Sequence, residues 1–154
     1  MDLILWRHAD AAEAGPGEPD LQRPLTPKGE RQAQRVAQWL NQRLPESTRI
    51  LVSPALRTQQ TAQALGRKFR TVDTIAPDAP MQAVLDAARW PTGRDPVLVV
   101  GHQPTLGLVL SHLLGGGPRE GLAVRKGGVW WLRSRRREGD AQLLVVAVMG
   151  PECV

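Results

Sequence analysis

Two histidines and two arginines stand out in this sequence because each comes at, or soon after, the end of a short apolar segment. They are Arg7, His8, Arg57 and His102. The planar guanidinium of an arginine matches the oxygens of a phosphoryl group, and a neutral imidazole is a competent nucleophile toward phosphorus. A second imidazole, when protonated, can donate to the phosphoryl oxygens as negative charge develops. These residue types predict a phosphoryl-transfer pocket built without a metal.

The apolar segments predict how these side chains come together. Runs at 3–6, 49–52 and 96–100 have the length and composition of buried β-strands. In a parallel sheet with right-handed crossovers, the carboxyl ends of the strands share one edge, and ligands bind outside that edge. Arg57 falls in the first turn of the helix predicted after Ser53-Pro54, where a cation is unfavourable unless an anion lies nearby. The sequence therefore predicts that all four side chains meet at one edge.

Strand-like and helix-like patterns alternate along the rest of the chain. Helices are predicted at 26–44, 53–65, 81–89 and 105–114, the first with an N-cap at Thr26-Pro27, and the glycine-rich loop 115–121 ends the last. A weaker strand is predicted at 72–75, and a hairpin is predicted from 129–132 and 143–148. This alternation is typical of an α/β domain with a mostly parallel central sheet, here with a C-terminal β-hairpin.

Length and composition narrow the class of protein. A chain of 154 residues suits one domain spanning 1–154. No apolar run approaches the roughly 18 residues needed to cross a membrane, and the first residues lack the pattern of a secretory signal. The single cysteine, Cys153, cannot form an internal disulfide, so a cytoplasmic location is expected. The net charge of +5 favours anionic partners.

The same residues also have plainer interpretations. A lone histidine is more often structural than catalytic, but coincidence at three strand ends is the weaker explanation. Zinc sites need clustered ligands, and adjacent arginines would repel a divalent cation, so no metal and no other cofactor is expected. His112 lies off the apolar stripe of its helix and is interpreted as a surface residue. The basic run Arg133–Arg137 is interpreted as a solvated hairpin tip, and scarce aromatic residues disfavour nucleic acid as a partner.

Four segments, in order along the chain, carry a family resemblance. They are WRHADA at 6–11, RPLTPKG at 23–29, LVSPALRTQQTA at 51–62 and VLVVGHQPTLG at 97–107. Together they resemble the histidine phosphatase superfamily, and within it the short phosphohistidine phosphatases of the SixA type. RHA at 7–9 replaces the RHG common across the superfamily, a variation that this branch tolerates.

The resemblance implies a three-layer α/β/α fold like that of phosphoglycerate mutase. It also implies that His8 is the phosphorylated nucleophile and that Arg7, Arg57 and His102 hold the phosphoryl group. The expected substrate is a phosphorylated protein of the histidine-phosphotransfer type, and a monomer is expected.

The general acid is left open between two aspartates. Asp10 lies two residues from His8, and Asp78 lies about where related enzymes place an acidic donor. Imidazole leaves phosphorus more readily than an alkoxide. The absence of a clearly placed general acid in the sequence therefore favours a phosphohistidine substrate. Short connections after the key strands also favour a phosphoryl group on a protein surface. The alternatives are a phosphomonoesterase or mutase-like enzyme acting on small metabolites, and a non-catalytic module that binds phosphoproteins or nucleic acid.

Overall fold

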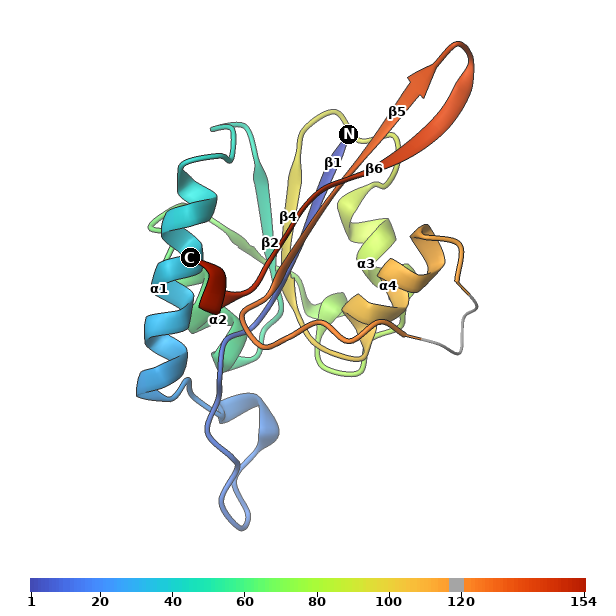
Figure 1. Ribbon diagram of the computed structural model, residues 1–154. Helices are drawn as coiled ribbons and strands as arrows, with labels where there is room; N and C mark the ends of the chain where they lie inside the picture. Colours follow the sequence, from blue (N-terminus) through green and yellow to red (C-terminus); the bar gives the residue numbers. More distant parts are fainter. Residues whose placement is uncertain (117–120) are drawn as a thin grey trace.

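The computed structural model describes residues 1–116 and 121–154. In this part of the chain, six strands form one sheet in the order β3-β2-β4-β1-β5-β6 (Figure 1). The strands are β1 (Asp2–Arg7), β2 (Arg49–Val52), β3 (Arg70–Thr71), β4 (Val97–Gly101), β5 (Val129–Arg137) and β6 (Asp140–Met149). The α-helices are α1 (Pro27–Asn41), α2 (Leu56–Gln63), α3 (Met81–Ala88) and α4 (Thr105–Leu113).

The sheet is mixed rather than uniformly parallel. β3, β2, β4 and β1 run parallel to one another, whereas β5 pairs antiparallel with β1 and with β6. The predicted strands at 3–6, 49–52 and 96–100 thus form the parallel centre. The predicted C-terminal hairpin is confirmed but longer than expected, since β5 and β6 are joined only at residues 138 and 139. Arg135, Arg136 and Arg137 are exposed there, as expected for a solvated tip. Arg133 is not at the tip: it lies opposite Asp2 of β1, and its Nε donates to the carboxylate of Asp2 over 2.7 Å.

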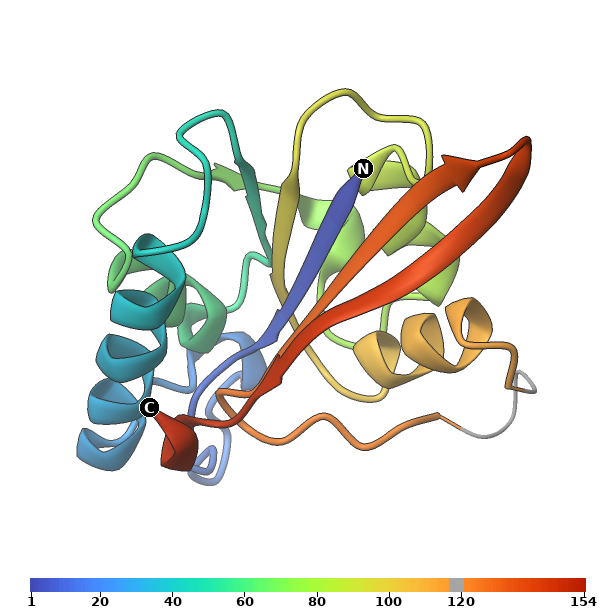
Figure 2. The same ribbon diagram turned by 45° about the horizontal axis from the view of Figure 1, so that its top comes forward.

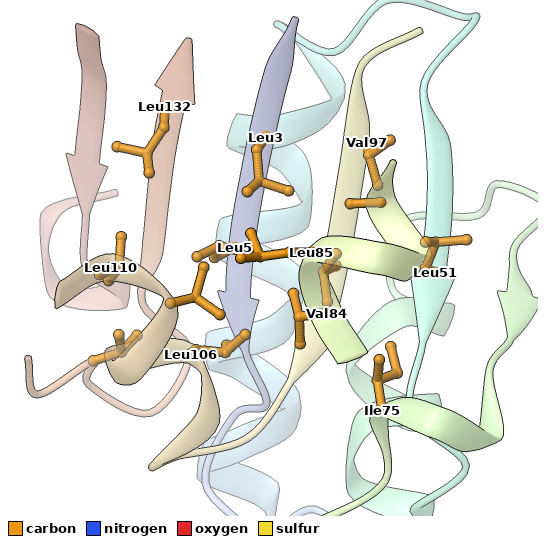
Figure 3. Close-up of a cluster of buried hydrophobic side chains, with 14 residues drawn as sticks. Leu3, Leu5, Leu51, Ile75, Val84, Leu85, Val97, Leu106, Leu110 and Leu132 are labelled. Carbon is orange, nitrogen blue, oxygen red and sulfur yellow. The ribbon is translucent and has the colours of Figure 1, made fainter. Parts of the chain in front are cut away.

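Helices cover both faces of the sheet, which gives the three layers implied by the resemblance (Figure 2). Alternate residues of β1 enter different clusters: Leu3 and Leu5 pack with residues of α3 and α4, while Ile4 and Trp6 pack with residues of α1. Figure 3 shows the first of these clusters. Because both faces of the central strands are buried, their inner segments, Leu3–Trp6, Ile50–Val52 and Val97–Val100, are apolar at every position instead of alternating.

The first helix begins as its sequence indicates. The side chain of Thr26 accepts a hydrogen bond from the backbone N–H of Gly29 over 3.0 Å, and Pro27 is the first helical residue. The second helix begins later than predicted. α2 starts at Leu56 with Ala55 as its N-cap, so Ser53 does not cap it, although Arg57 still falls in its first turn.

The strand predicted at 72–75 is wrong. β3 ends at Thr71, and Asp73–Ile75 forms a short 3-10 helix. Val72 and Ile75 both pack into the cluster on the α3 and α4 side. Residues three apart point to opposite faces of a strand but to the same side of a 3-10 turn, so burial of both favours the turn.

Three smaller points complete the fold. His112 is exposed, as expected. Of the predicted 115–121 loop, residues 117–120 lie outside the described residues. In the part of the chain that the structure covers, no helix is both long and apolar enough to cross a membrane.

Candidate active site

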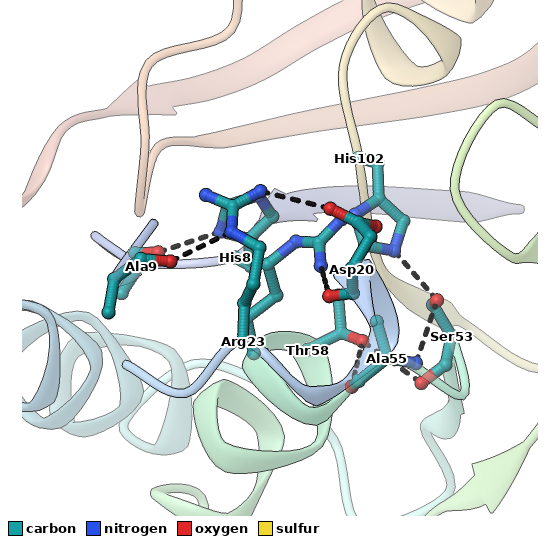
Figure 4. Close-up of polar contacts among 10 residues, drawn as sticks. His8, Ala9, Asp20, Arg23, Ser53, Ala55, Thr58 and His102 are labelled. Atoms are coloured by element: carbon teal, nitrogen blue, oxygen red, sulfur yellow. Dashed lines mark hydrogen bonds and ion pairs between the residues drawn. The ribbon is translucent and has the colours of Figure 1, made fainter. Parts of the chain in front are cut away.

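The carboxyl ends of β1, β2 and β4 border one pocket with a volume of about 230 Å³. All four residues singled out in the sequence line it. The lining residues are Arg7, His8, Asp20, Arg23, Arg57, Pro77, Asp78, His102, Gln103 and Lys126. Figure 4 shows the polar contacts among several of them.

Backbone pairing between neighbouring strands brings the two imidazoles together. Arg7 of β1 lies opposite Gly101 of β4, and the N–H of His8 donates to the carbonyl oxygen of Gly101 over 3.1 Å. His102 follows directly, so each ring begins one residue beyond a paired strand end. The centroids of the two rings lie 5.4 Å apart. This separation leaves both rings within reach of one phosphoryl group.

The ring of His8 is held in one orientation by its own chain. Its Nδ1 lies 2.7 Å from the carbonyl oxygen of Ala9. Because a carbonyl can only accept, Nδ1 carries the proton, and the neutral ring keeps a free lone pair on Nε2. Burial lowers the pKa of His8 to about 4, and the nearby guanidinium groups act in the same direction. The ring is therefore neutral at physiological pH, as a nucleophile must be.

His102 is anchored by a serine at the neighbouring strand end. Its Nε2 lies 2.7 Å from Oγ of Ser53, and that oxygen also accepts a weak hydrogen bond from the N–H of Ala55. Burial, followed by the positive charge of Arg57, lowers the pKa of His102 to about 3. The ring is therefore neutral in the free pocket. The prediction that it donates in protonated form applies to the pocket with a phosphoryl group bound, and it stays a prediction.

The guanidinium of Arg57 contacts an acid that the sequence analysis did not single out. Its Nη1 donates to the carbonyl oxygen of Asp20 over 3.0 Å, and its Nη2 lies 3.1 Å from Oδ2 of the same residue. Asp20 also pairs with Arg23 at 3.2 Å. Burial acts to raise the pKa of Asp20, but the hydrogen bonds from these two arginines outweigh it and hold the pKa below its ordinary value. Asp20 therefore stays ionised and offsets charge in the pocket.

Three buried side-chain nitrogen atoms in the described residues have no hydrogen-bond partner in the protein, and all belong to residues that line the pocket. They are Nε of Arg7, Nε of Arg57 and Nδ1 of His102. Arg7 is otherwise fixed by a bond from Nη1 to the carbonyl oxygen of Val124, 2.8 Å long, and burial lowers its pKa. Buried donors without partners are costly, so this arrangement favours an anionic ligand.

The two candidate acids have different positions. Asp78 lines the pocket, is exposed, and has a left-handed backbone with φ of 65°. Asp10 does not line it. The carboxylate of Asp10 instead accepts a hydrogen bond from the hydroxyl of Thr26 over 2.7 Å. This bond is the main cause of the lowered pKa of Asp10, and the hydrogen bond from Lys126 lowers the pKa further. Asp10 therefore supports the start of α1.

Sequence reasoning missed Asp20, Arg23, Gln103 and Lys126 as lining residues. Arg23 did lie within the quoted segment RPLTPKG, and Asp20 precedes it by three residues, so this segment held a usable signal. Lys126 stands in a loop with no pattern that could have indicated its position. Among the described residues, no cluster of three or more potential ligands could hold a metal ion.

Residues 3–79 match the family model described as histidine phosphatase superfamily, branch 1. A curated relative, phosphohistidine phosphatase SixA of Escherichia coli K12, is 31% identical over 124 residues, which cover 75% of this chain and 76% of that protein.

The chain belongs to the histidine phosphatase superfamily.

Two solved structures share the fold of this chain. The protein histidine phosphatase SixA complexed with tungstate superposes with a TM-score of 0.77 at 26% identity, covering 98% of this chain and 97% of that one. A mutant phosphoserine phosphatase from Entamoeba histolytica, in complex with phosphoserine, has a TM-score of 0.71 at 16% identity, covering 99% and 98%. The second likeness shows the fold alone. Membership of the superfamily supports a phosphatase activity. The structural neighbours of the chain include phosphatases that act on small metabolites.

Proposed function

We propose that the protein is a phosphohistidine phosphatase that works through a phosphorylated His8. The observation that carries the proposal is the neutral ring of His8, with Nε2 free to attack, 5.4 Å from the ring of His102 in a pocket with three guanidinium groups. The likeness to SixA proteins supports the same activity. Turnover is proposed in two steps.

In the first step, Nε2 of His8 attacks phosphorus in line with the leaving group. A bond forms between Nε2 and phosphorus, and the bond from phosphorus to the imidazole nitrogen of the substrate breaks. Arg7 and Arg57 balance the negative charge of the phosphoryl oxygens. The leaving imidazole takes up a proton from solvent or from a carboxyl group at the pocket edge.

His102 donates to the phosphoryl oxygens through Nδ1. If the hydroxyl of Ser53 donates to Nε2, the neutral ring carries its proton on Nδ1, the atom without a partner in the protein. A bound dianion also raises the pKa of the ring toward the charged form. In the second step, water attacks the phosphorylated His8, releases inorganic phosphate and restores the neutral ring.

Phosphohistidine is preferred over a phosphomonoester because of the leaving group. An alkoxide needs a well-placed acid, yet Asp10 is outside the pocket and Asp78 is exposed at its edge. Imidazole needs no well-placed acid, because its second nitrogen can take up a proton from solvent and the ring then leaves as neutral imidazole. The pocket volume of about 230 Å³ suits a phosphoryl group with one ring better than a large metabolite. A substrate protein with an exposed phosphohistidine fits these properties of the pocket. We propose the cytoplasm as the place where the two proteins meet.

The second candidate is a phosphomonoesterase of small metabolites. The presence of Asp78 in the lining favours it, because that carboxyl could protonate an alkoxide. The test compares kcat/KM on a phosphohistidine-bearing phosphotransfer domain with kcat/KM on phosphoserine and p-nitrophenyl phosphate. The proposal predicts at least about a 100-fold preference for phosphohistidine, worth about 2.7 kcal/mol in transition-state binding. A preference for a monoester, lost in Asp78→Asn, supports the second candidate instead.

A further inference from the structure

A groove beside the active site is larger than the active-site pocket itself. Its volume is about 580 Å³, against about 230 Å³. The basic groove, as we call it, is lined by Lys28, Arg31, Gln32, Arg35, Arg125, Pro151 and Glu152. Four of these seven side chains are cationic and one is acidic. The acid, Glu152, is paired with Arg125, which leaves the charge of the groove strongly positive.

The positions of the cations on α1 destabilise the isolated helix. Lys28, Arg31 and Arg35 are spaced by three and four residues, so they share one face and repel one another. Lys28 and Arg31 also lie near the N-terminus of the helix, where the dipole disfavours positive charge. All three side chains are exposed. A bound anionic surface would relieve both effects.

The basic groove is joined to the active site by a short loop. Arg125 lines the groove, while the next residue, Lys126, lines the active-site pocket. Gly127 then donates its N–H to the carbonyl oxygen of His8 over 2.9 Å. On the helix side, Gln32 of the groove accepts from the N–H of Asp10 over 2.9 Å. A substrate with its phosphohistidine over His8 would therefore extend along this groove.

We propose that the basic groove docks an acidic face of the phosphorylated protein substrate, next to its phosphohistidine. This inference rests on the proposed function. The active-site pocket holds little more than a phosphoryl group and its ring, so the remainder of a protein substrate must lie on the rim. Carboxylates are the groups that a face of arginines and lysines recognises. The lining contains no aromatic side chain on which a nucleotide base could stack, which favours a protein over a nucleic acid.

The test uses the paired variant Arg31→Glu/Arg35→Glu. The matched control is Arg136→Glu/Arg137→Glu, which changes the net charge by the same four units at the tip of the β5–β6 hairpin. This tip projects away from α1 (Figure 1). Each enzyme is assayed on a phosphorylated phosphotransfer domain with an acidic surface and on free phosphoramidate. We expect kcat/KM on the domain to fall about tenfold or more in the groove variant alone, with loss of its salt dependence. Activity on phosphoramidate should stay at the wild-type level.

Binding of the same domain without phosphate separates docking from catalysis. The groove variant should bind it at least about tenfold more weakly than wild type and control do, whatever the outcome of the activity assay. If wild type does not hydrolyse the phosphorylated domain but binds it through the groove, the proposed function fails and the docking surface stands. Equal binding by the groove variant and the wild type overturns the docking proposal. So does preferential binding of a DNA duplex that only the groove variant loses.

Discussion

The buried imidazoles should make the stability of the fold depend on pH. His8 and His102 are 6% and 4% exposed, with pKa values lowered from 6.5 to about 4 and about 3. Between pH 7.5 and 5.5 the unfolded chain protonates both rings, while the folded chain keeps both neutral. The unfolded state then binds more protons, so stability is complete above pH 6.5 and falls as the pH drops below it. We expect a loss of about 1 to 2 kcal/mol for each ring and about 3 kcal/mol for the pair.

Urea unfolding at pH 7.5, 6.5 and 5.5 measures this loss directly. The His8→Asn/His102→Asn variant should lose most of the dependence over that range, whatever its absolute stability. His112→Asn is the matched control, because that imidazole is exposed in the folded chain. A wild-type protein whose unfolding free energy is flat from pH 7.5 to 5.5 would refute the reasoning that both rings are buried and neutral.

Three further outcomes are expected. Ser53→Ala removes the hydroxyl that orients His102, so kcat should fall about 10- to 100-fold with KM nearly unchanged; an equal loss through KM would contradict that role. Asp20→Ala removes a half-exposed carboxylate that competes for Arg57, so inorganic phosphate should inhibit up to about fivefold more strongly, equivalent to about 1 kcal/mol. Gly29→Ala would place its Cβ 1.9 Å from a backbone oxygen of the loop after β1, so unfolding should become easier by about 1 to 3 kcal/mol, measurable as a lower Tm.

The centre of the fold and of the site could be predicted because both depend on short-range patterns in the sequence. Uninterrupted apolar runs predicted the parallel strands, since strands covered on both faces need apolar residues at every position. The residue types after those runs predicted which side chains meet, because the carboxyl ends of parallel strands lie at one edge. Arg7, His8, Arg57 and His102 all line the pocket as a result.

Features that depend on distant contacts could not be predicted in the same way. The pairing of Asp20 with Arg57 spans 37 residues, and Asp20 begins a short 3-10 helix, Asp20–Gln22, that no periodicity in the sequence indicates. The protonation state of His102 depends on burial and on neighbouring charges, which its sequence context does not reveal. Asp10 was a reasonable acid by distance along the chain, but the start of α1 takes up its carboxylate.

The central claim is that His8 receives the phosphoryl group. The most direct measurement is mass spectrometry of the enzyme, quenched in alkali within milliseconds to seconds of mixing with a phosphorylated phosphotransfer domain. We expect a phosphate on the nitrogen of His8 that appears and decays at least as fast as kcat, with no such label in His8→Ala. Full turnover with His8 unlabelled, or a label on another residue, would contradict it.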